Sequence, residues 1–581
     1  SLDDWPKMNT TQKLAEKALA ASGLTHAQKR NWLNLNKPQT GEGKLELARI
    51  LRNTGNASQA NDLIKEVWRS HSLSSRSTNA ILSDHSRLLS KSDHAERVEM
   101  LLWTGQRSEA RRLLSKLNTA DRKLAEARLA LIEGRRGVDR TIKSVPTSMQ
   151  NDPGLLHDRA RWRRRKTRNM EGAIELLLKL DTADAVPAGR VRIWKERRIV
   201  LRTLIKERRW KEAYKLAANH NLSSGVSFAE AEFYAGWVAL KHLNDASTAF
   251  EHFDSLANGV GSPISVSRAH YWRGEALSAL SKTEDAEAAY VSATEHIFTF
   301  YGQLAAERLR KADSNKMFLS FDNVGIPTEQ ERLSFEANPV VRAAMLLAEA
   351  GRLRDFERFS FHIDDTLKSS AEHQMLFDIA WDFLQPRSGI RGAKSGLSRG
   401  LLAPDAAFPI VELPDSPATG IAEDALILAL SRQESELTPT AISHANARGM
   451  MQIIPATARN TARQTGMPYR TSWLTDDPTY NMRLGRSYLD GLIEHFNESY
   501  IMALAAYNAG PSRPERWITE YGDPRQAGVD PVDWIESIPF SETRNYVQRI
   551  MENLQVYRHR LANEPVAIRL SDDLKRGAPD R

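Results

Sequence analysis

The sequence predicts an all-α protein that consists of a long array of helical pairs, a short helical segment and a compact helical module at the C-terminal end. Apolar residues recur with a helical period through residue 300, with few β-branched runs. A loose repeat of helix, short polar turn and helix runs through the same region. From Ile421 to Leu561 the pattern is again helical, in short pieces that Pro and Gly separate.

The repeat is clearest where a small residue or a turn precedes an alanine that opens the next helix. A short side chain is favoured there because two helices that cross closely leave no room for a longer one. We expect an irregular α-superhelix, a solenoid or ring of helical hairpins over residues 1–325, whose units bury their faces against neighbours. An irregular array that serves only as a scaffold is the alternative. The alanines are Ala60, Ala110, Ala213, Ala246 and Ala286.

The spacing of these alanines is regular only in part. The last two steps are 33 and 40 residues, near the period of tetratricopeptide-like helical pairs. The first two steps, 50 and 103 residues, are irregular.

Two breaks interrupt the helical pattern before the C-terminal module. The first lies between Lys311 and Glu336, and the second, from Gln385 to Gly400, is rich in Gly, Ser and basic residues. Extended chain around Pro409 and Pro414 follows. We therefore expect a superhelical domain (1–325), a small helical linker domain (326–405), a compact helical domain (406–565) and a C-terminal tail (566–581).

Composition narrows the class of protein. The chain has 581 residues, 41% hydrophobic and 27% charged, with a mean hydropathy of −0.49, and it has no apolar run near the roughly 18 residues that cross a bilayer. Zero Cys excludes disulfides, thiolate metal sites and a cysteine nucleophile. The chain begins SLDDWPKMNT, without a secretion signal, and we expect that a signal has been removed.

The net charge of +8 favours a polyanionic partner, either nucleic acid or an acidic cell wall. The densest basic cluster runs from Arg159 to Arg168 and includes Trp162. Such a cluster suits a nucleic-acid contact, but a solvated basic helix face is the alternative. Because the cluster is local and no recognition module accompanies it, we expect no nucleic-acid partner.

One glutamate stands on an apolar helical stripe. Leu426, Leu430 and Glu434 are spaced four residues apart and share one helix face. Desolvation disfavours the charged form, so a glutamate there can keep its proton near neutral pH and act as a general acid. The alternative is that Glu434 is solvated at the helix end or pairs with Arg432 or Arg448.

Other site chemistries lack their motifs. The 15 His residues show no HExxH spacing, and no Walker, dinucleotide-binding or GxSxG pattern is present. We predict no metal ion and no organic cofactor.

Four short segments of the C-terminal module, taken together, resemble the soluble lytic transglycosylase family. They are RQES (432–435), ARGMMQIIP (447–455), AAYNAG (505–510) and IPFSETRNYV (538–547). FYGQLAAERL (300–309) is similar to the family's signature near the end of its superhelical region. The resemblance implies that the C-terminal module is a lysozyme-like, mainly α catalytic domain.

The resemblance also implies a reaction and a set of site residues. Glu434 is expected to act first as acid and then as base, cleaving the MurNAc-β-1,4-GlcNAc bond of peptidoglycan and leaving 1,6-anhydro-MurNAc ends. Ser443, Gln452, Tyr507 and Glu542 are expected near substrate. Each also has an ordinary structural role as the alternative: Ser443 in a turn, Gln452 as a buried amide, Tyr507 as a core tyrosine and Glu542 as an acid in the first turn of a helix. Asn508 is expected mainly to secure a helix end, and Ile454 replaces the methionine of several relatives.

Two rival functions stay open. A muramidase of the same fold needs a water-activating carboxylate, for which Glu542 or Asp477 is the candidate. A non-catalytic scaffold that only binds the cell wall is the other. The substrate implies glycan strands as partner and a periplasmic location. We further expect a monomer whose repeats contact cell-wall synthesis proteins.

Overall fold

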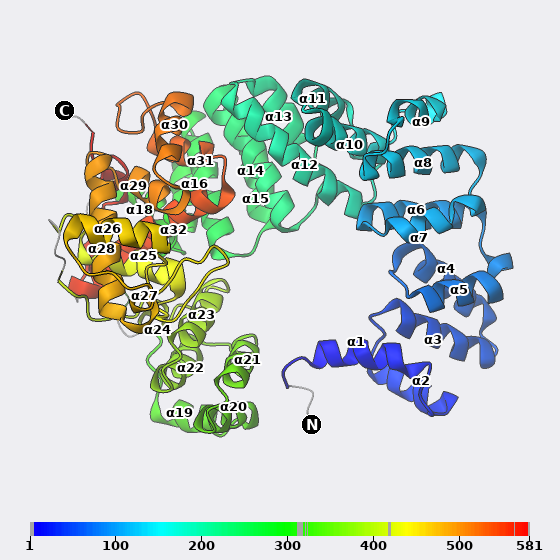
Figure 1. Ribbon diagram of the computed structural model, residues 1–581, viewed down its shortest axis with the longest axis horizontal. Coiled ribbons are helices and arrows are strands. Elements are labelled where there is room, and N and C mark those ends of the chain that lie inside the picture. Colours follow the sequence, from blue (N-terminus) through cyan, green and yellow to red (C-terminus); the bar gives the residue numbers. More distant parts are fainter. Residues whose placement is uncertain are drawn as a thin grey trace. The chain divides into compact units, whose positions relative to one another are not determined.

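The computed structural model describes residues 5–310, 318–319, 321, 324–415, 420–562 and 564–578 (Figure 1). Its chain forms two compact units: residues Ser1–Thr203 with Lys211–Ser223, and residues Leu204–Trp210 with Ser224–Arg581. The regular secondary structure of the described residues is helical apart from two strands of two residues each and isolated bridges, which confirms the all-α prediction. Among them, no helix combines the length and apolarity that crossing a bilayer requires.

The first unit is an array of antiparallel helical pairs, and α12 and α13 share residues with the second unit. Its helices are α1 (Met8–Leu19), α2 (His26–Leu35), α3 (Gly41–Asn53), α4 (Ala57–Ser70), α5 (Ser75–Asp84), α6 (Lys91–Thr104), α7 (Arg107–Arg112), α8 (Thr119–Glu133), α9 (Val138–Ser144), α10 (Pro153–Trp162), α11 (Met170–Lys179), α12 (Pro187–Lys206) and α13 (Trp210–Ala218), with a π-helical turn η4 (Arg163–Thr167).

The repeat alanine is the fourth residue of the second helix in a pair. Ala60, Ala110, Ala213 and Ala286 hold this position and are almost fully buried. Ala246 opens its helix as predicted, as the first residue of α15, but it is only half-buried. The position equivalent to the other four alanines is Ala249, which is 0% exposed. With this correction the last two steps become 36 and 37 residues.

The irregular early steps also have a structural explanation. The step of 103 residues contains two further pairs, in which Thr141 of α9 and the fully buried Ala173 of α11 hold the fourth position. The step of 50 residues contains one additional helix, α5. The array is therefore more regular than the alanine pattern indicates.

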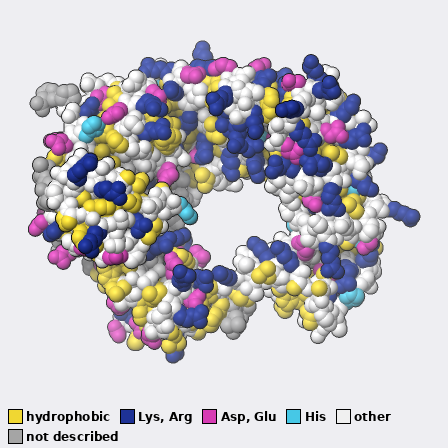
Figure 2. All heavy atoms as spheres, viewed as in Figure 1, with side chains coloured by type: hydrophobic (Ala, Val, Ile, Leu, Met, Phe, Trp, Pro, Cys, Tyr) yellow, Lys and Arg dark blue, Asp and Glu magenta, His cyan; other side chains and the backbone are white. Residues whose placement is uncertain are grey.

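Basic side chains gather over α10 to α12 of the first unit (Figure 2). The cluster predicted from Arg159 to Arg168 lies at the end of α10 and in η4. Trp162 packs into the core beside Leu131 and Val138 and is not presented to solvent as an aromatic platform. The cluster is thus a basic helix face, as the alternative interpretation had it.

The second unit continues the helical pairs and ends in the C-terminal module. Its further helices are α14 (Gly225–His242), α15 (Ala246–Gly259), α16 (Pro263–Ala279), α17 (Thr283–Thr294), α18 (Phe300–Arg310), α19 (Glu329–Glu336), α20 (Pro339–Glu349), α21 (Leu353–Asp364), α22 (Ser370–Asp382), α23 (Pro386–Leu397), α24 (Pro404–Ala407), α25 (Asp424–Ser435), α26 (Pro455–Thr465), α27 (Trp473–Asp476), α28 (Pro478–His495), α29 (Tyr500–Ala509), α30 (Ser512–Tyr521), α31 (Pro531–Ser537), α32 (Ser541–Ala562) and α33 (Leu570–Leu574).

The first predicted break is non-helical over residues 324–328, whereas the second is largely helical. Part of the first break, 311–317 with residues 320, 322 and 323, lies outside the described residues, and its end forms α19. The second break was wrong, because its Gly-rich segment forms α23. Gly389 and Gly396 let α23 approach α22: a Cβ atom would lie 2.8 Å from the Phe377 ring and 2.7 Å from the His373 ring.

The segment predicted as a C-terminal tail packs back onto the second unit. Strand β2 (Val566–Ala567) pairs antiparallel with β1 (Phe318–Leu319). In α33, Leu570 and Leu574 are buried, and Asp573 forms a 2.5 Å ion pair with Arg558 of α32. Residues 579–581 lie outside the described part.

Candidate active site

Glu434 is the penultimate residue of α25, and the chain leaves this helix through a left-handed turn. Leu426 and Leu430 on the same face are 0% exposed, which confirms the predicted apolar stripe. Glu436 and Leu437 follow with φ of 50° and 55°. The turn leaves the Glu434 side chain partly accessible at the end of an otherwise buried helix.

The carboxyl group of Glu434 has a raised proton affinity. Burial raises its pKa from 4.5 to about 7, the nearby Glu542 charge adds to this, and a hydrogen bond from Tyr546 acts against it. The Tyr546 hydroxyl donates to Oε1 of Glu434 at 2.6 Å. A carboxyl group in this state holds a proton near neutral pH and can give it up.

The two arginines that could have neutralised Glu434 have other partners. Arg432 is buried, donating to the Ala407 carbonyl and, at 3.2 Å, to Oδ1 of Asn553. Nε of Arg448 donates to Oδ1 of Asn446 at 3.1 Å. The alternative of an ion-paired Glu434 is therefore wrong.

Tyr507 of α29 lies close to Glu434 but bonds elsewhere. Its hydroxyl donates to the Met451 carbonyl at 2.7 Å, and its ring centroid is 5.3 Å from that of Tyr488. Burial and then the Glu434 charge raise the pKa of Tyr507. The tyrosine that donates a hydrogen bond to Glu434 is instead Tyr546.

Tyr546 was not predicted as a site residue. It stands in the segment IPFSETRNYV, among apolar residues of the last helix, and is 5% exposed. Tyr546 and Glu542 are four residues apart on α32, so both side chains lie on one face of this helix. This spacing is the sequence signal that could have indicated Tyr546 as a site residue.

Ser443 and Gln452 shape the loop between α25 and α26. Short bridges pair Ile442 with Arg448 and Arg448 with Ile453. Oγ of the exposed Ser443 accepts the Ala447 N–H at 3.0 Å. Gln452 has a φ of 47°, and its Nε2 donates to the carbonyls of Ala441 at 3.1 Å and Gly449 at 2.8 Å. Both residues therefore hold the loop, and their contact with substrate stays a prediction.

Asn481 anchors this loop to α28. Its Oδ1 accepts the Met451 N–H at 2.9 Å, and its Nδ2 donates to the carbonyls of Arg448 and Leu474 at 3.0 Å. The cap of α28 is Asp477, which accepts the Tyr480 N–H at 2.9 Å. Asn481 is fully buried and was missed as a support of the site.

Gly449 is required where the loop passes Asn481. Its φ is 74°, and a Cβ atom there would overlap the Leu474 carbonyl and the Asn481 amide. Ser435 adds a further tie, because its Oγ donates to the Met450 carbonyl at 2.7 Å.

The start of α32 meets the end of α29 beside Glu434. Thr543 donates to Oδ1 of Asn508 at 2.6 Å, so Asn508 secures the ends of both helices. Glu542 lies in the first turn of α32 and is exposed. Ile454 is 47% exposed, directly before Pro455, which begins α26.

The signature segment at 300–309 forms α18 and packs against α31 and α32. The Phe300 N–H donates to Oε2 of Glu552 at 2.6 Å, and the Tyr301 hydroxyl donates to Oε1 of Glu536 at 2.5 Å. Nε2 of Gln303 donates to the Glu552 carbonyl at 3.1 Å. This segment therefore fixes the helix that carries Tyr546.

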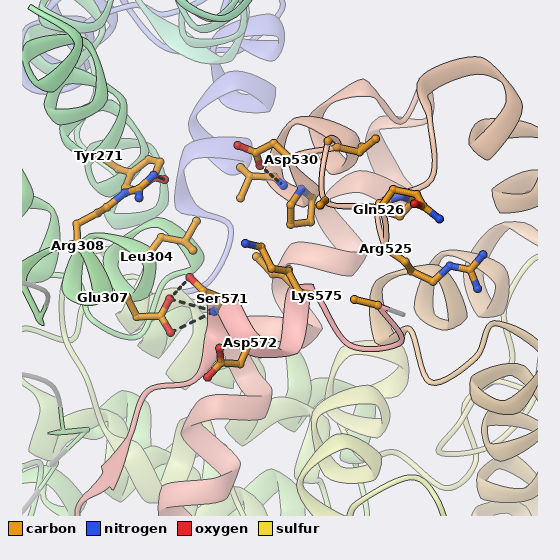
Figure 3. A pocket seen from close by; sticks show the side chains of 18 residues that line it. Tyr271, Leu304, Glu307, Arg308, Arg525, Gln526, Asp530, Ser571, Asp572 and Lys575 are labelled. Carbon is orange, nitrogen blue, oxygen red and sulfur yellow. Dashed lines mark hydrogen bonds between the residues drawn. The ribbon is translucent and has the colours of Figure 1, made fainter. Parts of the chain in front are cut away.

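A large cavity lies elsewhere in the second unit (Figure 3). Its volume is about 1290 Å³, and its wall comes from α16, α18, α33 and the loop from Pro524 to Asp530. The carboxylate of Glu307 accepts three hydrogen bonds from the N–H and the Oγ of Ser571, and Arg308 pairs with Glu275 at 2.8 Å. None of the predicted site residues lines this cavity.

No group of three or more His, Cys, Asp or Glu side chains in the described part of the chain could hold a metal ion. The predicted absence of a cofactor stays a prediction.

Two family models match the C-terminal part of the chain. The transglycosylase SLT domain matches residues 419–528, and the soluble lytic transglycosylase helical domain matches residues 537–565. The first contains Glu434 and its supporting loop, and the second contains most of α32.

Curated relatives match the same part. The soluble lytic murein transglycosylase of Salmonella typhimurium is 41% identical over 134 residues, 23% of this chain and 20% of the relative. That of Escherichia coli K12 is 39% identical over 140 residues, 24% of this chain and 21% of the relative. The matches thus span about a fifth of these relatives' length.

Solved structures match nearly the whole chain. The lytic transglycosylase Slt from Pseudomonas aeruginosa has a TM-score of 0.66 at 22% identity, covering 97% of this chain and 88% of that one. The 70 kDa soluble lytic transglycosylase from Escherichia coli has a TM-score of 0.57 at 19% identity, covering 96% and 87%. At these identities the likeness shows the fold, a superhelical array with a lysozyme-like domain. The chain thus carries a transglycosylase SLT domain at residues 419–528 and is similar, over its C-terminal part, to the soluble lytic transglycosylases.

Proposed function

We propose that the chain is a peptidoglycan lytic transglycosylase, in which Glu434 acts as the acid and then as the base. The observation that carries the proposal is the partly accessible Glu434 carboxyl, whose pKa is raised to about 7 and whose Oε1 accepts the Tyr546 hydroxyl. The matches to SLT domains and to soluble lytic murein transglycosylases support the substrate class. We propose residues 406–565 as the catalytic domain.

In the first step the protonated Glu434 donates to the glycosidic oxygen between MurNAc and GlcNAc, and the C1–O bond breaks. Such a positioned proton transfer contributes roughly 10²–10⁴-fold to a rate. Because Tyr546 bonds to Oε1, Oε2 is the oxygen placed to carry the proton. The same hydrogen bond stabilises the carboxylate that the donation leaves behind.

In the second step the Glu434 carboxylate takes the proton from the C6 hydroxyl of MurNAc as that oxygen attacks C1. The product is a 1,6-anhydro ring, Glu434 regains its proton, and no water is consumed. In this proposal Gln452, Ser443 and Tyr507 contact the sugar beside this carboxyl group. The exposed Ile454 offers the sugar an apolar contact.

A muramidase is the second candidate, and the Glu542 charge favours it. Glu542 is exposed and raises the pKa of Glu434, so the two carboxyl groups lie within electrostatic reach of each other. A water molecule activated by Glu542 would give hydrolysis. Asp477 is less suited to this role, because its carboxylate caps α28.

The deciding experiment is mass spectrometry of the products that the protein releases from purified peptidoglycan, with Glu434→Gln as control. A transglycosylase gives muropeptides lighter by one water than hydrolytic ones, and only with intact Glu434. Reducing-end products would establish a muramidase. No products from the wild type would favour a non-catalytic, cell-wall-binding scaffold.

This function implies glycan strands as the partner and the periplasm as the location. Contacts between the helical pairs and cell-wall synthesis proteins, and a monomeric state, belong to the same proposal.

A further inference from the structure

We propose that one basic face of the first unit binds a carboxylate-bearing glycan polymer as a site separate from Glu434. The face consists of Arg165 and Arg168 in and after η4, and of Arg192 and Lys195 on α12. The identity of the polymer as peptidoglycan rests on the proposed function. Three observations support the inference. They are the net positive charge of residues 159–202, the ion pairs and hydrogen bonds that occupy the neighbouring cations, and the packing of Trp162 against the core.

Positive charge is concentrated in a short part of the chain. Residues 159–202 contain 14 Lys and Arg against 5 Asp and Glu, a net charge of +9, whereas the whole chain has +8. The other residues together are therefore close to neutral, at −1. A field of one sign over a single face attracts polyanions and raises their association rate.

Several cations of this region already have partners. Arg164 pairs with Glu196 at 2.5 Å, and Arg163 pairs with Glu175 at 3.3 Å. The buried Arg197 donates to the carbonyls of Leu177 and Leu180. These interactions stabilise the fold and use two of the five acidic residues.

The four residues of the basic face are exposed, and no ion pair joins them to an acid among residues the structure describes. The Arg164–Glu196 pair ties η4 to α12, which places both halves of the face on neighbouring elements. Burial and Arg163 lower the pKa of Arg159, a sign of crowded positive charge at the adjoining end of α10. In Figure 2, Lys and Arg side chains gather over this part of the molecule.

The partner is a carboxylated glycan and not a nucleic acid. Single-stranded nucleic acid is bound by cations together with exposed aromatic rings on which bases stack. The one aromatic residue of the cluster, Trp162, packs against the core. Guanidinium groups without stacking platforms suit carboxylates, which they bind with paired hydrogen bonds.

The test measures binding without cleavage, in a Glu434→Gln background. The basic-face variant carries Arg165→Gln, Arg168→Gln, Arg192→Gln and Lys195→Gln. The matched control removes four exposed charges from the other end of the unit, with Lys13→Gln, Lys17→Gln, Arg30→Gln and Lys37→Gln. Each protein is sedimented with insoluble peptidoglycan and with chitin, a neutral glycan, over a range of salt concentrations.

We expect the basic-face variant to bind peptidoglycan about tenfold more weakly than the control, with a shallower salt dependence. Chitin binding should be weak and equal in both. If the quadruple variant loses its helical circular dichroism, Arg165→Gln alone is compared with Lys13→Gln, because neither exposed side chain supports the fold.

Equal peptidoglycan binding by the two variants would overturn the inference. So would equal binding to peptidoglycan and chitin, or tighter binding to anionic phospholipid vesicles or single-stranded DNA than to peptidoglycan. The proposed function fails by a different result, the absence of cleavage products from the wild type, which leaves the binding comparison intact.

Discussion

Glu434 and Glu536 are both carboxyl groups buried in the second unit, yet their proton affinities differ. Arg268 at 2.7 Å and Arg544 at 3.5 Å neutralise Glu536 and hold its pKa below the ordinary value despite complete burial. Among the residues that the structure describes, no cation pairs with Glu434; its neighbours are a phenol and a second carboxylate, and its pKa rises to about 7. Cationic partners, more than burial, decide which carboxyl group keeps its proton.

A third carboxyl group, Glu552, shows that proton affinity alone does not identify an acid. Burial raises its pKa to about 7 as well. Its oxygens accept from the Phe300 N–H and pair with Arg549 at 2.9 Å, and it is 6% exposed. A general acid needs a raised pKa together with a free oxygen that substrate can reach, and among these three Glu434 meets both conditions.

The largest effect is expected from Glu434→Gln, which removes the titrating proton and keeps the shape. Cleavage of peptidoglycan should fall by roughly 10²–10⁴-fold. The measurement is the rate of soluble product release, with thermal unfolding as a check that the variant is folded. Activity within a factor of two of the wild type would show that Glu434 is not the catalytic acid.

Glu536→Gln tests the other side of the comparison. It keeps a polar group for Tyr301 and Gln548 but takes the shared counter-charge from the buried Arg544 and the partly buried Arg268. We therefore expect a loss of about 3–5 kcal/mol in the free energy of unfolding. Urea denaturation measures it. The control is Glu515→Gln, which removes an exposed pair with His495 and should cost less than about 1 kcal/mol.

Glu434→Gln should also make the protein more stable than the wild type, by a margin that increases as pH rises. The folded state raises the pKa of Glu434 from 4.5 to about 7, so it binds more protons than the unfolded state and loses stability as pH rises between these values. The variant lacks this loss. Its advantage in the free energy of unfolding should grow from acid to neutral pH, level off at roughly 3 kcal/mol and show in denaturation curves at matched pH. An advantage that does not change with pH would contradict the raised pKa.

Tyr546→Phe removes the hydrogen bond that favours the charged form of Glu434. The pKa of Glu434 should therefore rise, and the alkaline limb of the pH–activity profile should move up by about one pH unit. Tyr488→Phe is the matched control, since Tyr488 contacts Tyr507 and makes no bond to Glu434 in the described part of the chain. An unmoved limb would show that Tyr546 has only a packing role.

Glu542→Gln should have the smallest effect and the opposite sign. Removing its charge lowers the pKa of Glu434, so the alkaline limb should move down by less than about one pH unit. Products should keep their anhydro ends. A loss of all activity with hydrolytic products in the wild type would assign Glu542 as the second carboxylate of a muramidase.

Sequence patterns predicted the all-α fold and the place of Glu434, because both follow from local helical periodicity. They marked the repeat at Ala246, three residues before the equivalent Ala249. They also took the Gly-rich segment 385–400 for a break, since only packing against α22 shows why Gly389 and Gly396 suit a helix there. Asn481 and Tyr546 support the site across 30 and 112 residues of sequence, distances at which no local pattern pairs them with Met451 and Glu434.

The most direct test is titration of Glu434 itself by infrared difference spectroscopy between the wild type and Glu434→Gln, from about pH 5 to about pH 9. The account predicts a protonated carboxyl band that disappears with a midpoint of about 7. A midpoint near 4.5, the ordinary value, would mean that Glu434 is already ionised at neutral pH and cannot serve as the acid.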